Sequence, residues 1–160
     1  ADKDVIDLLQ YNLRSQMFAK ALPMVLVKGA LKRLEMLKTM PELKDKLWEN
    51  VNYLQNGLKD KGFNIGDTNT CVTPVYLEGS IPEAMALVND LRENYSIFLS
   101  IVVYPVIPKG IILLRMIPTA THTKADIDET LTAYEAIREK LENGTYKKIA
   151  EQTTVDVSAE

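Results

Sequence analysis

Arg115 is the residue whose type and position most clearly predict chemistry. It follows a short apolar run, Ile111–Leu114, and Pro118 closes the segment. Such a run, rich in branched aliphatic residues and bounded by turn residues, is typical of a buried strand. A guanidinium in a buried strand costs free energy unless an anion or a hydrogen-bonding partner meets it. The position therefore predicts either a site for an anionic ligand or a buried structural ion pair, and the sequence leaves both open.

The other candidate side chains have ordinary structural explanations beside the functional ones. His122, next to an expected helix cap, could act as a base, but a hydrogen-bonded structural role is favoured. Tyr104 could line a pocket, although packing is favoured, and Cys71 suits a small strand residue better than a nucleophile. A single histidine excludes a His-ligated metal cluster, and the sequence holds no Cys-x-x-Cys pair, glycine-rich phosphate loop or Gly-x-Ser-x-Gly elbow.

The elements that must position Arg115 are expected in the order helix, long helix, strand, helix, strand, strand, helix. Apolar residues at three- and four-residue steps predict a short helix over 2–12 and helical structure over 24–61, as two long helices or as one helix bent at Pro41. Residues 14–22 are expected to be irregular, and Gly62 should end the long helical segment.

Strands are expected at 71–78, where Pro74 argues for an edge or a bulge, and in the two apolar runs 101–103 and 111–114. A capping box at Ser80 and Glu83 should open one helix, and Thr123 should cap the last one, which ends at Gly144. This order predicts an α+β fold, in which helices cover one face of a small, mostly antiparallel sheet of about three strands.

Composition excludes several classes of function. The 160 residues suit a single globular domain, with 46% apolar and 26% charged residues. A net charge of −3 offers no general attraction to phosphate backbones, so no nucleic-acid partner is expected. No apolar run approaches the roughly 20 residues that span a bilayer, and no signal-peptide pattern is visible. Because the single cysteine agrees with a reducing compartment, we expect a cytoplasmic protein without a transmembrane segment.

Several segments together resemble the C-terminal domain of the α-oxoamine synthases. The likeness rests on Tyr-Pro-Val-Ile-Pro-Lys-Gly at 104–110, Leu-Arg at 114–115, Thr-Ala-Thr-His-Thr at 119–123 and Asp-Ile-Asp at 126–128. Met-Phe-Ala-Lys-Ala-Leu-Pro at 17–23 also resembles the segment that precedes the family's long helix, so the likeness extends nearly from the start of the chain to about Gly144.

The resemblance implies the small C-terminal domain of a type I pyridoxal-phosphate fold. Residues 1–23 would be the end of the large domain and a connector, 24–144 the small domain, and 145–160 a tail that frays over Val155–Glu160. The family includes 8-amino-7-oxononanoate synthase, 2-amino-3-ketobutyrate CoA ligase, 5-aminolevulinate synthase and serine palmitoyltransferase. The amino-acid sequence around Arg115 is most similar to that of bacterial serine palmitoyltransferases.

The implied activity is a pyridoxal-phosphate-dependent C-acyl transfer by a homodimer. An acyl-CoA condenses with a small amino acid, such as serine, glycine or alanine, to give an aminoketone, CoA and, in decarboxylating members, CO₂. By resemblance, Arg115 matches the arginine that binds the carboxylate of the amino acid. The segment 18–23 matches one near the cofactor phosphate of the partner subunit, where Ala19 and Ala21 replace frequent hydroxyl residues and leave Lys20 as the candidate phosphate contact.

The resemblance also identifies what this chain lacks. The lysine that forms the Schiff base, the aspartate on the pyridine nitrogen and the histidine stacked on the ring belong to the family's larger domain. We therefore interpret the chain as the C-terminal piece of such an enzyme, inactive alone, with no catalytic residue or bound cofactor of its own. Two alternatives stay open: a non-catalytic domain that dimerises or docks a partner through the helices at 24–58, and a regulatory domain that binds an amino acid through Arg115.

Overall fold

The computed structural model describes the backbone of residues 1–157 and the side chains as far as Gln152. The chain divides into two compact units, Ala1–Pro41 and Glu42–Glu160. The domain boundaries at residues 23 and 144, which follow from the resemblance, stay a prediction. Of the frayed end expected at Val155–Glu160, residues 158–160 lie outside the described part of the chain.

The first unit consists of helices without a buried residue. Helix α1 (Lys3–Asn12) and helix α3 (Met24–Thr39) confirm the two helices expected on either side of the connector. The segment expected to be irregular contains one further short helix, α2 (Arg14–Met17). Apolar residues recur along α1 and α3, but none of them is buried, so this unit has no core of its own.

Helix α4 (Pro41–Asp60) begins at the proline that the sequence marks as a break. Met40 has left the helical region, with φ −126° and ψ 65°, as the residue before a proline tends to do. Proline itself suits the first turn, where its missing N–H would find no partner. Two helices rather than one bent helix therefore occupy 24–61, and Gly62, with φ +73°, ends the second in the left-handed conformation.

The sheet has three antiparallel strands in the order β1-β3-β2. These are β1 (Thr73–Glu78), β2 (Ser100–Val102) and β3 (Ile111–Met116), so the strand that holds Arg115 is the central one. Pro74 lies on the edge strand β1, as its missing N–H predicts. The expected α+β class and the number of strands are confirmed.

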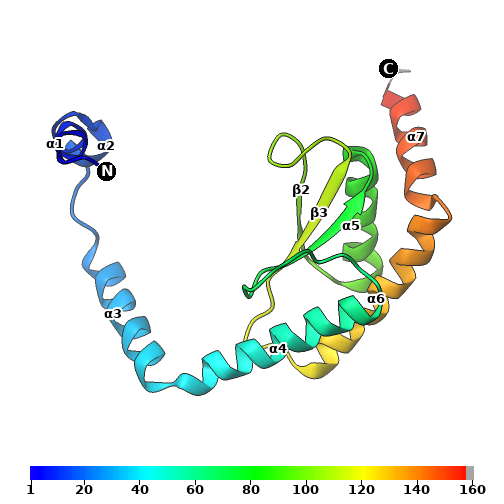
Figure 1. Ribbon diagram of the computed structural model, residues 1–160, viewed down its shortest axis with the longest axis horizontal. Coiled ribbons are helices and arrows are strands. Elements are labelled where there is room, and N and C mark those ends of the chain that lie inside the picture. Colours follow the sequence, from blue (N-terminus) through cyan, green and yellow to red (C-terminus); the bar gives the residue numbers. More distant parts are fainter. Residues whose placement is uncertain (158–160) are drawn as a thin grey trace. The chain divides into compact units, whose positions relative to one another are not determined.

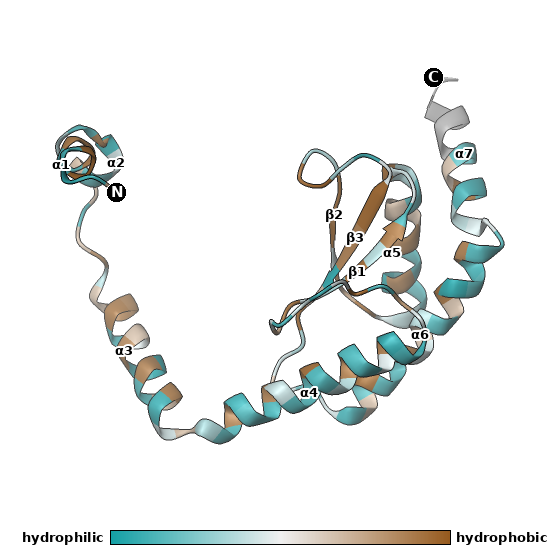
Figure 2. Ribbon diagram, viewed as in Figure 1, coloured by the Kyte–Doolittle hydropathy of each residue, from teal (hydrophilic) through white to brown (hydrophobic). Residues whose placement is uncertain are grey.

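One face of the sheet forms the core with the helices α4, α5 (Ile81–Tyr95) and α6 (Lys124–Glu142). Figure 1 shows α5 running alongside the strands, and Figure 2 shows β3 as apolar over most of its length. Side chains alternate across a strand, so the residues of β3 that enter this core are every second one. The buried sheet residues are Thr73, Val75, Ile112, Leu114 and Met116.

The predicted caps open both helices that follow a strand. Ser80 and Glu83 form a capping box at α5, in which each side chain accepts a hydrogen bond from the other residue's backbone N–H. Thr123 and Asp126 form the same arrangement at α6, which brings that helix directly after the loop that leaves β3. Both starts are thus fixed by the local sequence.

The segment 145–160, expected as a tail, contains a helix that belongs to the folded unit. Helix α7 (Thr145–Val157) follows Gly144, whose φ of +71° ends α6. Tyr146 and Ala150 of α7 are buried, with 2% and 7% of their surfaces exposed. The chain therefore continues beyond the expected end of the domain with a packed element. Within the described residues, no helix has an apolar stretch long enough to cross a membrane.

Candidate functional site

Arg115 lies on the face of the sheet that no helix of this unit covers. The alternation along β3 directs Ile112, Leu114 and Met116 into the core and leaves Arg115 exposed on the opposite face. The strand around it is therefore as predicted, but the expectation of a buried guanidinium is wrong for this chain. In the described structure this cation therefore meets solvent.

The side chain of Arg115 has one hydrogen-bond partner among the described residues. Its Nε donates to the hydroxyl oxygen of Ser100 over 3.0 Å. The two residues stand directly opposite each other in the β2–β3 ladder, and Pro74 stands opposite Arg115 on the β1 side. Among the side chains that the structure describes, residues 1–152, no acid forms an ion pair with Arg115, so the structure does not support the alternative of a buried structural ion pair. The guanidinium keeps its charge and the donors on Nη1 and Nη2 for an anion.

Two large apolar side chains are exposed just beyond the pair Ser100–Arg115. Continuing the pairing of Ser100 with Arg115 by two residues places Phe98 opposite Ile117, and these side chains are 85% and 56% exposed. A positive charge among exposed apolar groups is typical of a surface that another part of a protein covers.

A cavity of about 290 Å³ opens just beyond the end of β3. Its apolar wall comes from α4, the segment before β2, the end of β3 and the start of α6, and His122, Asp126 and Glu129 add polar groups. Arg115 is not among the residues that line it. The predicted anion site is therefore the open sheet face itself and not this cavity. The main apolar lining residues are Leu54, Ile97, Phe98, Met116, Ile117 and Ile127.

His122 holds the loop that joins β3 to α6. Its Nδ1 accepts a hydrogen bond from the backbone N–H of Thr119 over 2.9 Å. The buried side chain of Asn50, 2% exposed, donates to the carbonyl groups of Thr119 (3.0 Å) and His122 (2.8 Å). These contacts agree with the structural role favoured for His122. Asn50 was missed by the sequence analysis, because its partners are about 70 residues away along the chain.

The remaining candidates lie apart from any partner that would activate them. Lys20 is exposed between α2 and α3, and its amine has no hydrogen bond or ion pair among the described side chains. Tyr104, half exposed in the loop between β2 and β3, has the amine of Lys109 5.0 Å from the centre of its ring. Cys71 is a partly buried free thiol two residues before β1, so the expectation that it belongs to the strand is wrong.

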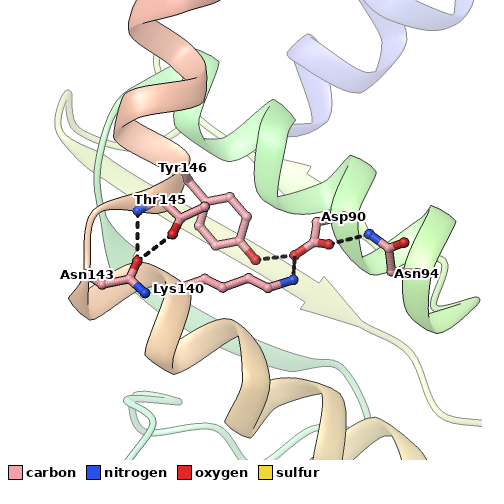
Figure 3. A network of polar contacts seen from close by, with 6 residues as sticks. All are labelled: Asp90, Asn94, Lys140, Asn143, Thr145 and Tyr146. Carbon is pink, nitrogen blue, oxygen red and sulfur yellow. Dashed lines mark hydrogen bonds and ion pairs between the residues drawn. The ribbon is translucent and has the colours of Figure 1, made fainter.

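A second polar cluster, formed by Asp90, Asn94, Lys140 and Tyr146, joins α5, α6 and α7 (Figure 3). Asp90 accepts hydrogen bonds from Lys140 (2.7 Å), Tyr146 (2.5 Å) and Asn94 (2.6 Å). Burial alone would raise the pKa of Asp90, but these donors together hold the pKa below its usual value. Hydrogen bonding to Asp90 raises the pKa of Lys140, and burial together with Asp90 raises that of Tyr146. At neutral pH Asp90 is therefore negative and Lys140 positive, and this suits a cluster that anchors α7 better than one that transfers protons.

Comparison with known proteins gives the family context of this geometry. Residues 1–133 match the family described as "Aminotransferase class I and II". A cysteate-C-fatty acyltransferase of Capnocytophaga ochracea is 74% identical over 153 residues, which are 96% of this chain and 36% of that protein. An 8-amino-7-oxononanoate synthase of Alkaliphilus oremlandii is 33% identical over 135 residues, 84% of this chain and 34% of that protein.

Solved structures of serine palmitoyltransferase have the same fold. A high-resolution structure of that enzyme with pyridoxal phosphate superposes with a TM-score of 0.71 at 27% identity, over 85% of this chain and 34% of that one. The chain spans about a third of the length of the relatives it matches. The resemblance stated from the sequence, and the small-domain fold that it implied, are confirmed. The chain belongs to the aminotransferase class I and II family, as part of a protein related to the α-oxoamine synthases.

Proposed function

We propose that the longer protein is a pyridoxal-phosphate-dependent C-acyltransferase. It would transfer the acyl group of a fatty acyl-CoA to a small amino acid, giving an aminoketone, CoA and, where the amino acid is decarboxylated, CO₂. The observation that supports this most directly is Arg115, a guanidinium without an ionic partner among the described residues, on the central strand of the open sheet face. A guanidinium binds a carboxylate with two parallel hydrogen bonds, and this would hold the α-carbon of the amino acid in a fixed position for the reaction.

Cysteate is the amino acid that we propose first. Serine, glycine and alanine were expected from the family resemblance, but the relative that is 74% identical is named for cysteate. Cysteate has a sulfonate in addition to its carboxylate, so its site must hold two anions. Arg115 would bind the carboxylate, as its counterpart does in the family, and the other anion would need a further donor.

The residues of this chain fit only one end of the cofactor. Lys20 is an exposed amine without an ionic partner in the described part of the chain, which suits a phosphate. No described side chain forms the set that would hold the ring and the aldehyde carbon, so we propose that the rest of the protein binds them. When bound, pyridoxal phosphate supplies an electron sink for the carbanion at the α-carbon of the amino acid.

The assembly that we propose is a cytoplasmic homodimer. Its support is the first unit, whose own helices bury none of the apolar side chains of α1 and α3, as in a segment that packs against another surface. A single cysteine agrees with a reducing compartment. The identity to an acyltransferase favours the enzyme over the alternatives of a non-catalytic docking domain or a free-standing regulatory domain.

The test is an assay of the full-length protein with pyridoxal phosphate, in which CoA release from palmitoyl-CoA is measured with cysteate, serine, glycine or alanine. We expect turnover with cysteate and none from the 160-residue chain alone. Arg115→Ala should raise the KM for the amino acid by about 10-fold or more, because a charged hydrogen-bonding partner is lost. Arg92→Ala, which removes the same charge from the exposed surface of α5, should leave both kinetic constants unchanged. Normal KM values in Arg115→Ala would contradict the proposed role, and absence of CoA release with every amino acid would contradict the proposed function.

A further inference from the structure

Ser100 is the polar neighbour that the sheet provides for Arg115. In an antiparallel ladder, residues directly opposite each other point to the same face, with their Cβ atoms about 5 Å apart. The two residues opposite Arg115 are Ser100 and Pro74, and only the serine has a hydrogen-bonding side chain. Its hydroxyl oxygen accepts the Nε–H of Arg115 over 3.0 Å.

This contact selects which edge of the guanidinium remains available. The group presents its five N–H bonds in one plane, and a carboxylate can meet it either along the edge with Nε and one Nη or at the end with both Nη atoms. Because Nε is bonded to Ser100, the side edge is occupied and the end with Nη1 and Nη2 remains free. The hydrogen bond also restrains the orientation of the guanidinium, because Nε belongs to this planar group and its N–H lies in the plane.

No other described side chain makes a hydrogen bond with Arg115. Tyr76, opposite Leu113 on the same face, has a hydroxyl group but does not bond to Arg115 in the described structure. Leu113 lies on the same face two residues before Arg115, and Ile117 follows two residues after it; both are apolar. An arginine held only by such neighbours would keep most of its rotamers and lose their entropy when a ligand binds. A side chain that is fixed before binding avoids that cost.

We propose that Ser100 is a positioning residue for the substrate carboxylate. By accepting the Nε–H, it orients Arg115 so that the carboxylate of the amino acid binds end-on to Nη1 and Nη2. The inference rests on the proposed function, because it requires that Arg115 binds that carboxylate. To the proposed function it adds a second residue, Ser100 of β2, and the end-on geometry in which the carboxylate binds.

The test compares variants of Ser100 in the full-length enzyme loaded with pyridoxal phosphate. Ser100→Thr keeps the hydroxyl, and Ser100→Val has nearly the same shape without it, so the pair separates the hydrogen bond from side-chain bulk. We expect Ser100→Val and Ser100→Ala to raise the KM for the amino acid by about 3- to 10-fold, the effect of one hydrogen bond to a charged group that orients a ligand contact. Ser100→Thr should stay within about 2-fold of the wild type, and the KM for palmitoyl-CoA should not change in any variant.

A double-mutant cycle separates failure of this inference from failure of the proposed function. In an Arg115→Ala background, Ser100→Ala should have no further effect on the amino-acid KM. If Arg115→Ala raises that KM but Ser100→Val and Ser100→Thr behave alike, the positioning role is overturned while the role of Arg115 stands. If Arg115→Ala has no effect, the carboxylate assignment fails and the inference fails with it. A crystal structure of the enzyme with bound amino acid in which Nε contacts the carboxylate would also overturn it, even if a variant is too unstable to assay.

Discussion

The hydroxyl group of Tyr146 in α7 donates a 2.5 Å hydrogen bond to the Asp90 carboxylate in α5, although the two residues are 56 positions apart. The same Asp90 oxygen accepts a hydrogen bond from Lys140, so one carboxylate connects three helices (Figure 3). Both contacts are partly buried, which makes the charge-assisted bonds stronger than surface pairs. Asp90 is therefore the residue that fastens α7 to the rest of the unit.

Replacing Asp90 should destabilise the chain through its two donors. Asp90→Ala leaves the amine of Lys140 and the hydroxyl of Tyr146 without their acceptor, and we expect the free energy of unfolding to fall by about 2–3 kcal/mol. Urea unfolding followed by circular dichroism measures this change. Glu93→Ala removes the same charge from an exposed position on the same helix and should change stability by no more than about 0.5 kcal/mol. Equal effects of the two variants would contradict the proposed role of Asp90 in anchoring α7.

The same cluster predicts how stability depends on pH. The folded pKa of Asp90 is lowered, so its contribution is complete above the unfolded value of about 4 and is lost as the pH falls through the folded pKa. The folded pKa of Lys140 is raised, so its contribution is complete below about 10 and is lost as the pH rises through the folded pKa. Thermal unfolding midpoints should form a plateau between these limits. In Asp90→Asn the part of the acid-side loss that comes from this residue should disappear, and an unchanged acid limb would count against the assignment.

Tyr134 is a buried tyrosine whose hydroxyl group, unlike that of Tyr146, has no described hydrogen-bond partner. Its ring packs edge-on against Phe63 with the centroids 5.2 Å apart, and its hydroxyl is buried without a hydrogen-bond partner in the described structure. An unpaired buried hydroxyl costs about 1–3 kcal/mol, so Tyr134→Phe should leave the free energy of unfolding unchanged or raise it by about 1 kcal/mol. Tyr146→Phe, which removes a paired hydroxyl, should lower it by about 1–2 kcal/mol. In thermal unfolding, Tyr146→Phe should lower the midpoint and Tyr134→Phe should not; a lowered midpoint for Tyr134→Phe would contradict the assignment.

Much of the sheet could be predicted from the sequence, but not the exposure of its arginine. The residues of β3 that point away from the core, Ile111 and Leu113, are also apolar, so the strand has the pattern of one buried on both faces. The exposed face becomes visible only when the helices are seen to cover a single side. The contact of Ser100 with Arg115 was missed for a related reason, because it depends on the register of β2 against β3 and not on any local pattern.

Helix α7 shows where a periodic pattern becomes too weak to recognise. Among its described side chains only Tyr146 and Ala150 are buried, and lysine, glutamate and threonine make up most of the rest. Such a helix is stabilised by its contacts with α5 and α6, which sequence periodicity does not report. The capping boxes at α5 and α6, in contrast, are local interactions between residues three apart, and they could be predicted directly.

Gly57 marks a close approach of α4 to α6. A Cβ at this position would stand 2.9 Å from Cδ2 and 3.2 Å from Cγ of Leu131, whose side chain is itself 7% exposed and cannot move freely. Alanine usually stabilises a helix by about 1 kcal/mol over glycine, but here we expect Gly57→Ala to lower the free energy of unfolding by about 1–3 kcal/mol because of overlap.

The matched control for Gly57 is Gly29 in α3. There the nearest atom to an added Cβ is the end of the flexible Arg33 side chain at 3.7 Å, so Gly29→Ala should not be penalised. Its effect should follow helix propensity and raise helicity, which far-ultraviolet circular dichroism detects. Adding Leu131→Ala to Gly57→Ala should recover part of the loss from overlap. A stabilising Gly57→Ala would show that the helices can separate without cost.

Asn50 fixes the loop that leads from Arg115 to α6, and its replacement by aspartate should be worse than its replacement by alanine. The amide nitrogen of Asn50 donates to the carbonyl groups of Thr119 and His122, and the side chain is 2% exposed. Asn50→Ala loses both bonds and leaves the His122 carbonyl without this donor, while the Thr119 carbonyl keeps only the backbone N–H of His122; this should lower the free energy of unfolding by about 2–3 kcal/mol. Asn50→Asp keeps the shape but turns a negative oxygen toward the same two carbonyls, so repulsion and desolvation add to the loss.

These effects should raise the pKa of the new carboxyl group, since a proton would both remove the charge and restore a donor. The stability of Asn50→Asp should therefore recover relative to Asn50→Ala as the pH is lowered from 7 to about 5, when thermal midpoints of the two variants are compared. If the difference between them does not depend on pH, the two carbonyl contacts do not determine the role of Asn50.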